Sequence, residues 1–190
     1  MMDLKEYTAI QKSWCVGRSD GIRRGAQSRV AQCVAWVRDV GRDVGNVLVI
    51  GPQHGFELQA FRALGATSIV GVDVVPEFCE DCRALGFECI QAKAESLARL
   101  VSGRWNVYAS HALEHCEDLA AVSQAIAAIR DAWLYVAVPI EPAGSRDRAH
   151  FSSLSREEDL LRHFSTWTMS QRYFVASRET KNTDARYLFT

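Results

Sequence analysis

Three features are missing from this sequence, and each absence excludes a class of protein. Charge of one sign is not in excess, because 22 Lys and Arg residues are balanced by 23 Asp and Glu residues, for a net charge of −1. A chain so balanced, with a pI near 6.5, is not expected to bind nucleic acid mainly by electrostatics. No apolar run approaches the roughly 18 residues that cross a membrane. The opening residues M-M-D-L-K-E-Y also lack the apolar stretch of a secretory signal.

The sequence also lacks the paired cysteine motifs of a structural zinc site. Its six cysteines include one C-x-x-C, from Cys79 to Cys82, whereas such a site normally presents two of these motifs or one with a matched Cys/His pair. Cys79 and Cys82 fall in a predicted helix, where we expect them to be buried among apolar residues. Because no secretory signal is recognised, we expect reduced thiols and a cytoplasmic protein.

What the sequence does contain is an alternation of strand-like and helix-like segments. Short β-branched or aromatic runs predict the strands, and apolar residues at three- and four-residue steps predict the helices between them. Such alternation is typical of parallel βαβ units in a doubly wound α/β sheet. The strands are expected at 47–50, 68–72, 87–90, 105–109 and 133–138, and the helices at 56–64, 76–85, 94–101 and 115–130.

The first 45 residues are predicted to be a helical segment that precedes an α/β core over 46–190. Apolar residues recur at helical spacing over 22–40 and predict a helix there. The aromatic residues Tyr7 and Trp14 either cover a site or pack between helices. With 190 residues and no linker long enough to divide the chain, we expect one domain.

The pattern changes after the fifth predicted strand. A loop over 143–153 is expected to lead to a helix over 155–163, in which Ser155 and Glu158 have the spacing of a capping box. Two further segments, 167–176 and 184–190, are predicted to close the sheet as a pair of strands.

A glycine loop follows the first predicted strand, in V-L-V-I-G-P-Q-H-G-F-E-L. Gly51 allows a tight turn, Gly55 lets the next helix pack closely, and free N–H groups there can meet the negative end of a ligand. Asp73 stands 22 residues after Gly51, at the end of the second strand, where a carboxylate can accept both ribose hydroxyls of a nucleoside cofactor. The alternative is an ordinary turn with a surface aspartate. A dinucleotide fingerprint requires G-x-G-x-x-G, so this loop fits nicotinamide cofactors poorly.

The glycine loop resembles the E/D-x-G-x-G-x-G loop of class I S-adenosylmethionine-dependent methyltransferases. S-H-A-L-E-H (110–115) resembles the S-H-V-L-E-H segment of small-molecule enzymes of this class. V-A-V-P-I-E-P (136–142) resembles their fifth-strand exit, and H-F-S-S-L-S-R-E-E-D-L (150–160) the stretch before their final helix. The resemblance covers 46–165 and implies a Rossmann-like, mostly parallel seven-stranded sheet with helices on both faces and an antiparallel last strand. It implies methyl transfer to a small molecule; the alternative is a non-catalytic module that binds S-adenosylmethionine or a nucleotide and serves a partner protein.

Carried over position by position, the resemblance assigns nine residues to the cofactor. They are Gly51, Gln53 and Gly55 at the amino-acid end of the cofactor, Asp73 on the ribose, Val74, Ala94 and Glu95 around the adenine, and Ser110 and His111 beneath the cofactor. Two positions depart from the family pattern. Gln53 replaces the middle glycine of the loop and is expected to crowd the amino-acid tail, and Lys93 replaces an aspartate that is frequent in the adenine segment.

The resemblance leaves the acceptor and any general base open. His150, on the loop after the fifth strand, is the first candidate base, and His115 is the second. The letters from His111 to His115 also spell H-x-x-E-H, an inverted zinc-protease motif that needs both histidines one turn apart on a helix. Here the motif directly follows a strand, so we expect no metal. No N/D-P-P-Y/W follows the fourth strand and no cysteine has a Pro-Cys setting, which argues against methylation of DNA bases.

Overall fold

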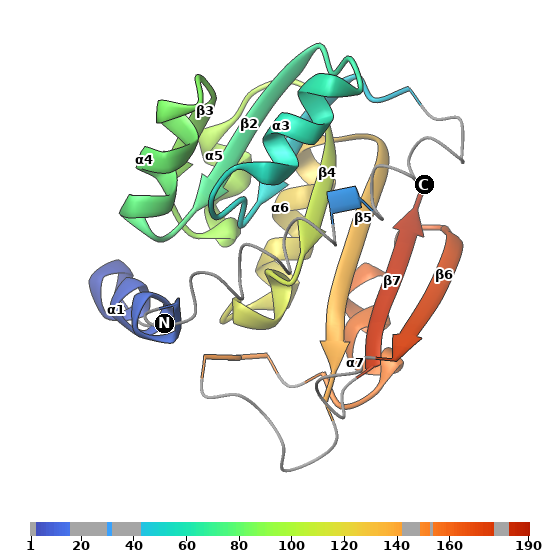
Figure 1. Ribbon diagram of the computed structural model, residues 1–190. Coiled ribbons are helices and arrows are strands. Elements are labelled where there is room, and N and C mark those ends of the chain that lie inside the picture. Colours follow the sequence, from blue (N-terminus) through green and yellow to red (C-terminus); the bar gives the residue numbers. More distant parts are fainter. Residues whose placement is uncertain (1–2, 16–29, 32–42, 142–148, 153, 177–182) are drawn as a thin grey trace.

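A seven-stranded sheet with the strand order β3-β2-β1-β4-β5-β7-β6 forms the centre of the protein (Figure 1). The computed structural model describes residues 3–15, 30–31, 43–141, 149–152, 154–176 and 183–190. Strands β1 to β5 are parallel to one another, and β7 is antiparallel to both of its neighbours, β5 and β6. The strands are β1 (Asn46–Ile50), β2 (Ser68–Asp73), β3 (Glu88–Gln91), β4 (Trp105–Ser110), β5 (Arg130–Ile140), β6 (Met169–Ala176) and β7 (Thr183–Phe189). The predicted sheet, with its antiparallel last strand, is confirmed.

Helices cover both faces of this sheet. On one face, α3 (Phe56–Ala63) and α4 (Pro76–Ala84) bury residues such as Phe61 and Cys79 against β1, β2 and β4. On the other face, α6 (Leu119–Ile129) forms the larger core, with Ile126 fully buried. The remaining helical elements are α1 (Leu4–Cys15), η1 (Ala94–Ser96), α5 (Leu97–Leu100), η2 (Leu113–His115), α7 (Glu157–Leu161) and η3 (Arg162–Phe164). Cys79 and Cys82 on α4 are fully buried thiols, as expected from the sequence.

Two predicted helix starts are wrong, and in both cases a different residue caps the helix. The helix expected at 115–130 begins at Leu119, because the Asp118 side chain accepts a hydrogen bond from the Ala121 N–H at 2.9 Å. The capping box expected at Ser155 and Glu158 does not form there. Instead, an Asp159 oxygen accepts from the backbone N–H groups of Ser155 (3.1 Å) and Arg156 (3.0 Å), and α7 begins at Glu157. The helix therefore starts two residues later than predicted.

Parts of the sequence prediction lie outside the described residues. The helix expected over 22–40 is described only at residues 30–31, which are helical, and most of the loop 143–153 is not described. Among the described helices, none combines the length and apolar character needed to cross a membrane.

The order of the strands creates a switch point between β1 and β4. From β1 the chain adds β2 and β3 on one side, then returns to place β4 and β5 on the other. The helices that follow β1 and β4 leave to opposite faces, so a crevice opens at the carboxyl ends of these two strands. In open α/β sheets, ligands bind in this crevice. Helix α1 lies at the same edge of the sheet (Figure 1).

Candidate functional site

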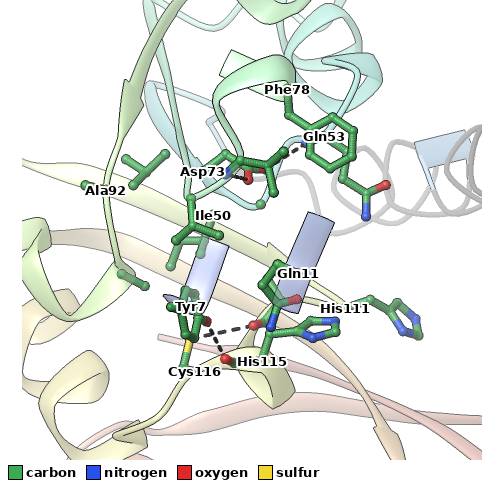
Figure 2. A pocket seen from close by; sticks show the side chains of 16 residues that line it. Tyr7, Gln11, Ile50, Gln53, Asp73, Phe78, Ala92, His111, His115 and Cys116 are labelled. Atoms are coloured by element: carbon green, nitrogen blue, oxygen red, sulfur yellow. Dashed lines mark hydrogen bonds between the residues drawn. The ribbon is translucent and has the colours of Figure 1, made fainter. Parts of the chain in front are cut away.

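A pocket lies at the carboxyl ends of the first four strands (Figure 2). Pockets at this place in an α/β sheet commonly bind small molecules or cofactors. Six of the nine residues that the family resemblance assigned to a cofactor line the pocket: Gly51, Gln53, Asp73, Val74, Ala94 and His111. Gly55, Glu95 and Ser110 do not line it. Residues from four separated segments of the sequence are thus brought together at one pocket.

The glycine loop owes its shape to two residues with left-handed backbone. Gly51 has φ +69° and Gly55 has φ +77°, a conformation that side chains rarely tolerate. A Cβ atom on Gly51 would lie 3.1 Å from the Cβ of Ala112, and one on Gly55 would lie 3.0 Å from Cδ1 of Leu85. The tight turn at Gly51 and the close packing at Gly55 are therefore both confirmed.

Gln53 also has a left-handed backbone, with φ +48°, although it carries a side chain. This conformation costs a non-glycine residue on the order of 1 kcal/mol. Two interactions of its backbone hold it there: its N–H donates to Oδ2 of Asp73 at 3.2 Å, and its carbonyl accepts from the Cys82 thiol at 3.4 Å. Gln53 thus adopts a backbone conformation typical of glycine, the residue that it replaces, at a cost in strain at the pocket wall.

Asp73 is a buried carboxylate, only 7% exposed, at the end of β2. Its Oδ1 accepts from the Val75 N–H at 2.9 Å, and its Oδ2 accepts from the Gln53 N–H. Burial raises the pKa of Asp73 from 3.8 to about 6, although the backbone hydrogen bonds act in the opposite direction. The alternative of a surface aspartate is therefore wrong. Figure 2 shows this side chain beside the Gln53 backbone at the pocket.

The segment after β3 contributes to the site in two ways. Ala94 lines the pocket, whereas Glu95 holds the chain that leads into α6, since its Oε1 accepts from the N–H groups of Glu117 (3.1 Å) and Asp118 (3.3 Å). Lys93 forms an ion pair with Glu117 at 2.8 Å and so has its charge balanced beside the pocket.

Helix α1 closes one side of the pocket. The Tyr7 hydroxyl donates to the carbonyl of His115, and its ring stacks on Phe151 with 5.3 Å between centroids. Gln11 Nε2 donates to the carbonyl of Ala149 at 3.1 Å. Tyr7 and Gln11 both line the pocket, so Tyr7 packs against the core and covers the site at once. The side chain of Trp14 lies outside the described residues.

Two of the five histidines form a pair at the end of the pocket. His115 lines the pocket, and its ring lies 4.8 Å from that of His150, edge to face. His150 is 7% exposed, and its Nδ1 lies 2.9 Å from Oε2 of Glu141. His150 is therefore a buried residue rather than part of a surface loop, and it does not line the pocket itself. The general-base role of either histidine stays a prediction.

In the turn after β4, His111 itself has a left-handed backbone and lies in the pocket wall. His111 has φ +51°, and its N–H donates to the carbonyl of Ala137 at 2.7 Å. Its Nδ1 lies 3.6 Å from Oε1 of the buried Glu114. Backbone strain of this kind is concentrated at functional sites.

Comparisons with known proteins reveal similarity in structure alone. No protein-family model and no curated protein matches the sequence. Magnesium protoporphyrin IX methyltransferase from Synechocystis with bound S-adenosylhomocysteine aligns with a TM-score of 0.69 and 16% identity, over 89% of this chain and 85% of that one. A 1,6-didemethyltoxoflavin N1-methyltransferase from Burkholderia thailandensis aligns with a TM-score of 0.68 and 17% identity, over 100% of this chain and 90% of that one. The N-methyltransferase NodS from Bradyrhizobium japonicum aligns with a TM-score of 0.68 and 14% identity, over 85% of each chain. The chain has the class I methyltransferase fold.

Within this fold, most of the pocket residues that the sequence did not single out are apolar. Their only signal is their place at the end of a strand or the start of a helix, which does not distinguish a pocket wall from the core. Burial raises the pKa of the Cys116 thiol well above its ordinary value, so this residue acts as an apolar wall. The apolar pocket residues that the sequence did not single out are Ile50, Val72, Val75, Phe78, Ala92, Ala112 and Cys116.

Proposed function

We propose that this protein transfers a methyl group from S-adenosylmethionine to a small-molecule acceptor. The observation that carries the proposal is the buried carboxylate of Asp73, which lies in the wall of a pocket at the β1–β4 switch point of a methyltransferase fold. A buried carboxylate is costly unless hydrogen-bond donors satisfy it. Its two backbone donors leave further lone pairs that can accept the two ribose hydroxyls of a nucleoside.

The other predicted cofactor residues fit the same ligand. Val74 and Ala94 offer apolar surface to an adenine ring, and the loop from Gly51 to Gln53 would hold the amino-acid end. Ser110, buried at the end of β4, and His111 in the pocket wall would lie beneath the cofactor. Gly55 and Glu95 act from outside the pocket, the first by shaping the loop and the second by holding the chain before α6.

The chemistry asks little of the protein beyond alignment and the exclusion of water. When bound, S-adenosylmethionine supplies a methyl group that is already activated by its positively charged sulfur. The protein must hold an acceptor atom in line with that group. Tyr7 and Gln11 on α1 keep water from one side, and His111 and His115 form the end of the pocket where an acceptor can arrive.

A small acceptor is supported by the ligands of one enzyme with a similar fold. The Burkholderia enzyme of similar fold was solved with 1,6-didemethyltoxoflavin, a small molecule, and S-adenosylhomocysteine bound.

Calorimetric titration with S-adenosylmethionine and, separately, with NAD tests the cofactor. We expect binding of the first alone, and we expect Asp73→Ala to weaken it by roughly 1.5–3 kcal/mol, the range for hydrogen bonds to a charged group. Asp131→Asn is the matched control, because Asp131 is exposed at the start of β5, the opposite end of the sheet. Preferential binding of NAD would contradict the proposal.

Transfer of an isotopically labelled methyl group to a panel of metabolites tests the reaction. Labelled product is the expected result. Tight binding of S-adenosylmethionine without transfer to any acceptor would favour a non-catalytic binding module.

A further inference from the structure

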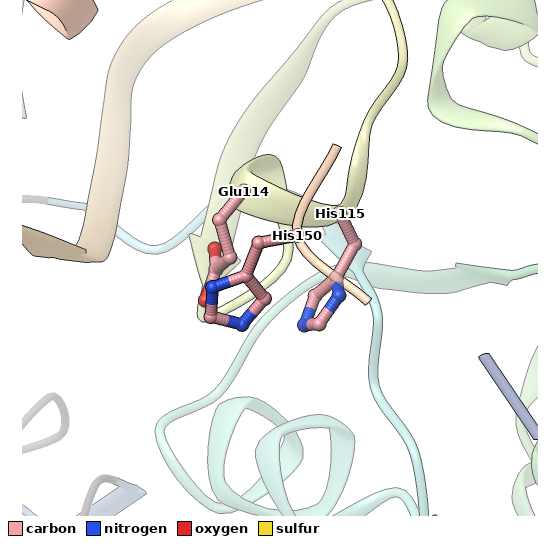
Figure 3. Close-up of side chains that lie close together, drawn as sticks. All are labelled: Glu114, His115 and His150. Carbon is pink, nitrogen blue, oxygen red and sulfur yellow. The ribbon is translucent and has the colours of Figure 1, made fainter. Parts of the chain in front are cut away.

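Three side chains of types that commonly bind metal ions lie close together beside the pocket. They are Glu114 and His115 from the turn after β4, and His150 from the chain after β5 (Figure 3). One ligand atom from each lies within 4.8 Å of the others. Ligand atoms around one tetrahedral zinc ion lie about 3.3 Å apart, so small side-chain rotations would bring these three into place.

Each histidine makes one Nδ1 contact of the kind that fixes the ring of a metal-binding imidazole. His115 Nδ1 lies 2.9 Å from the carbonyl oxygen of Ala149, which can only accept, so this nitrogen carries the proton. His150 Nδ1 lies 2.9 Å from Oε2 of Glu141 and donates to that carboxylate in the same way. In each neutral ring the lone pair then belongs to Nε2. Histidines that ligate metals almost always donate their other nitrogen to a carboxylate or a backbone carbonyl.

The backbone around these residues is held firmly enough to present them together. Ser152 ties the two segments, because its N–H donates to the carbonyl of Glu114 at 3.0 Å and its hydroxyl donates to the carbonyl of Cys116 at 2.7 Å. Glu114 is only 2% exposed and Glu141 only 5%. Buried carboxylates beside imidazoles suit a cation, because an ionised carboxylate is costly to bury without positive charge.

We propose that Glu114, His115 and His150 bind a divalent transition-metal ion, with Glu141 orienting His150. Two imidazoles and one carboxylate favour zinc or a similar ion over magnesium or calcium, which prefer oxygen ligands. Three protein ligands leave further coordination positions for water or for an acceptor atom, and His115 places the ion at the pocket wall.

This metal site is distinct from the inverted zinc-protease motif in the same letters. That motif would use His111 and His115 on one helix, whereas here the second histidine is His150, from another strand end. The sequence led us to expect no metal. Metal binding uses the same Nε2 lone pairs that a general base would need, so it replaces the predicted base role of His115 and His150. The site itself does not depend on the proposed function, because it can be tested with metal alone.

The test uses the full chain after treatment with a chelator. Zn²⁺ affinity is measured by calorimetry, and Co²⁺ is used as a spectroscopic probe. We expect one tight site, at least a 100-fold loss of affinity in His150→Gln and in Glu114→Gln, and a 10–100-fold loss in Glu141→Gln, which removes only the orienting carboxylate. His163→Gln is the matched control, because His163 lies in η3, outside the cluster, and it should bind Zn²⁺ like the unmodified protein.

Cobalt distinguishes this site from the buried thiols of α4 and β3. A ligand set of nitrogen and oxygen gives visible absorption without the intense near-ultraviolet band of thiolate bound to Co²⁺. Zn²⁺ affinity that is unchanged in His150→Gln and Glu114→Gln, or a thiolate band with Co²⁺, would overturn the proposal. Unchanged affinity combined with lost methyl transfer would return the two histidines to the general-base role. Circular dichroism of each variant verifies that it folds.

Discussion

Asp73 should make cofactor affinity depend on pH near neutrality. In the free protein, burial raises its pKa to about 6. Ribose hydroxyls donate to the ionised carboxylate, and protonation removes part of this acceptor capacity. If the cofactor binds only the ionised form, the apparent Kd scales with 1 + 10^(pKa − pH), so binding should be about tenfold weaker at pH 5 than at pH 7.

Calorimetry with S-adenosylmethionine from pH 5 to pH 8 measures this dependence. Asp73→Asn cannot ionise, so its affinity should be weaker at pH 7 and should show no transition near pH 6. Asp131→Asn, at the opposite end of the sheet, should keep the full dependence. Equal affinity of the unmodified protein at pH 5 and pH 7, or an equal transition in Asp73→Asn, would refute the role given to this carboxylate.

The same pKa shift has a consequence for stability without cofactor. The pKa of Asp73 rises from 3.8 to about 6 on folding, so the folded state binds more protons than the unfolded state between these values. The resulting stabilisation is fully present below pH 3.8 and is lost as the pH rises through about 6, which lowers the free energy of unfolding by up to about 3 kcal/mol. Urea denaturation should show this decline in the unmodified protein and not in Asp73→Asn.

Two further substitutions test the glycine loop. Gln53→Gly should tighten S-adenosylmethionine binding, because φ +48° suits glycine and the side chain no longer crowds the amino-acid tail; weaker binding in calorimetry would mean that the Gln53 side chain contacts the cofactor. Gly71→Ala should lower the free energy of unfolding by about 1–3 kcal/mol and weaken cofactor binding, since its Cβ would lie 2.9 Å from Cγ of Pro52 and 3.1 Å from the Cys89 sulfur. Unchanged urea denaturation of Gly71→Ala would show that the loop yields without cost.

The sheet and the cofactor loop could be predicted because their signals are local. A β-branched run followed by Gly51 predicts both the strand and its tight turn, and Asp73 ends the next strand one βαβ unit later. Where two signals compete within a few residues, the sequence was less informative. Asp118 and Asp159 displaced the expected helix starts because several acidic residues near each start offered similar capping chemistry.

The histidine pair could not be predicted as a unit, because its members are brought together by strand pairing. In the parallel pair of β4 and β5, Ser110 lies opposite Ala137, so the residues that follow each strand meet at one edge of the sheet. Glu114 and His115 come a few residues after the first of these strands, and His150 comes from the chain after the second. No spacing in the sequence encodes this contact, which depends on the order of the strands and on the return of the chain after residue 141. A linear motif such as H-x-x-E-H therefore pointed to His111, whereas the fold selects His150 as the partner of His115. In a doubly wound sheet, metal and catalytic ligand sets are best sought among the residues that follow adjacent strands.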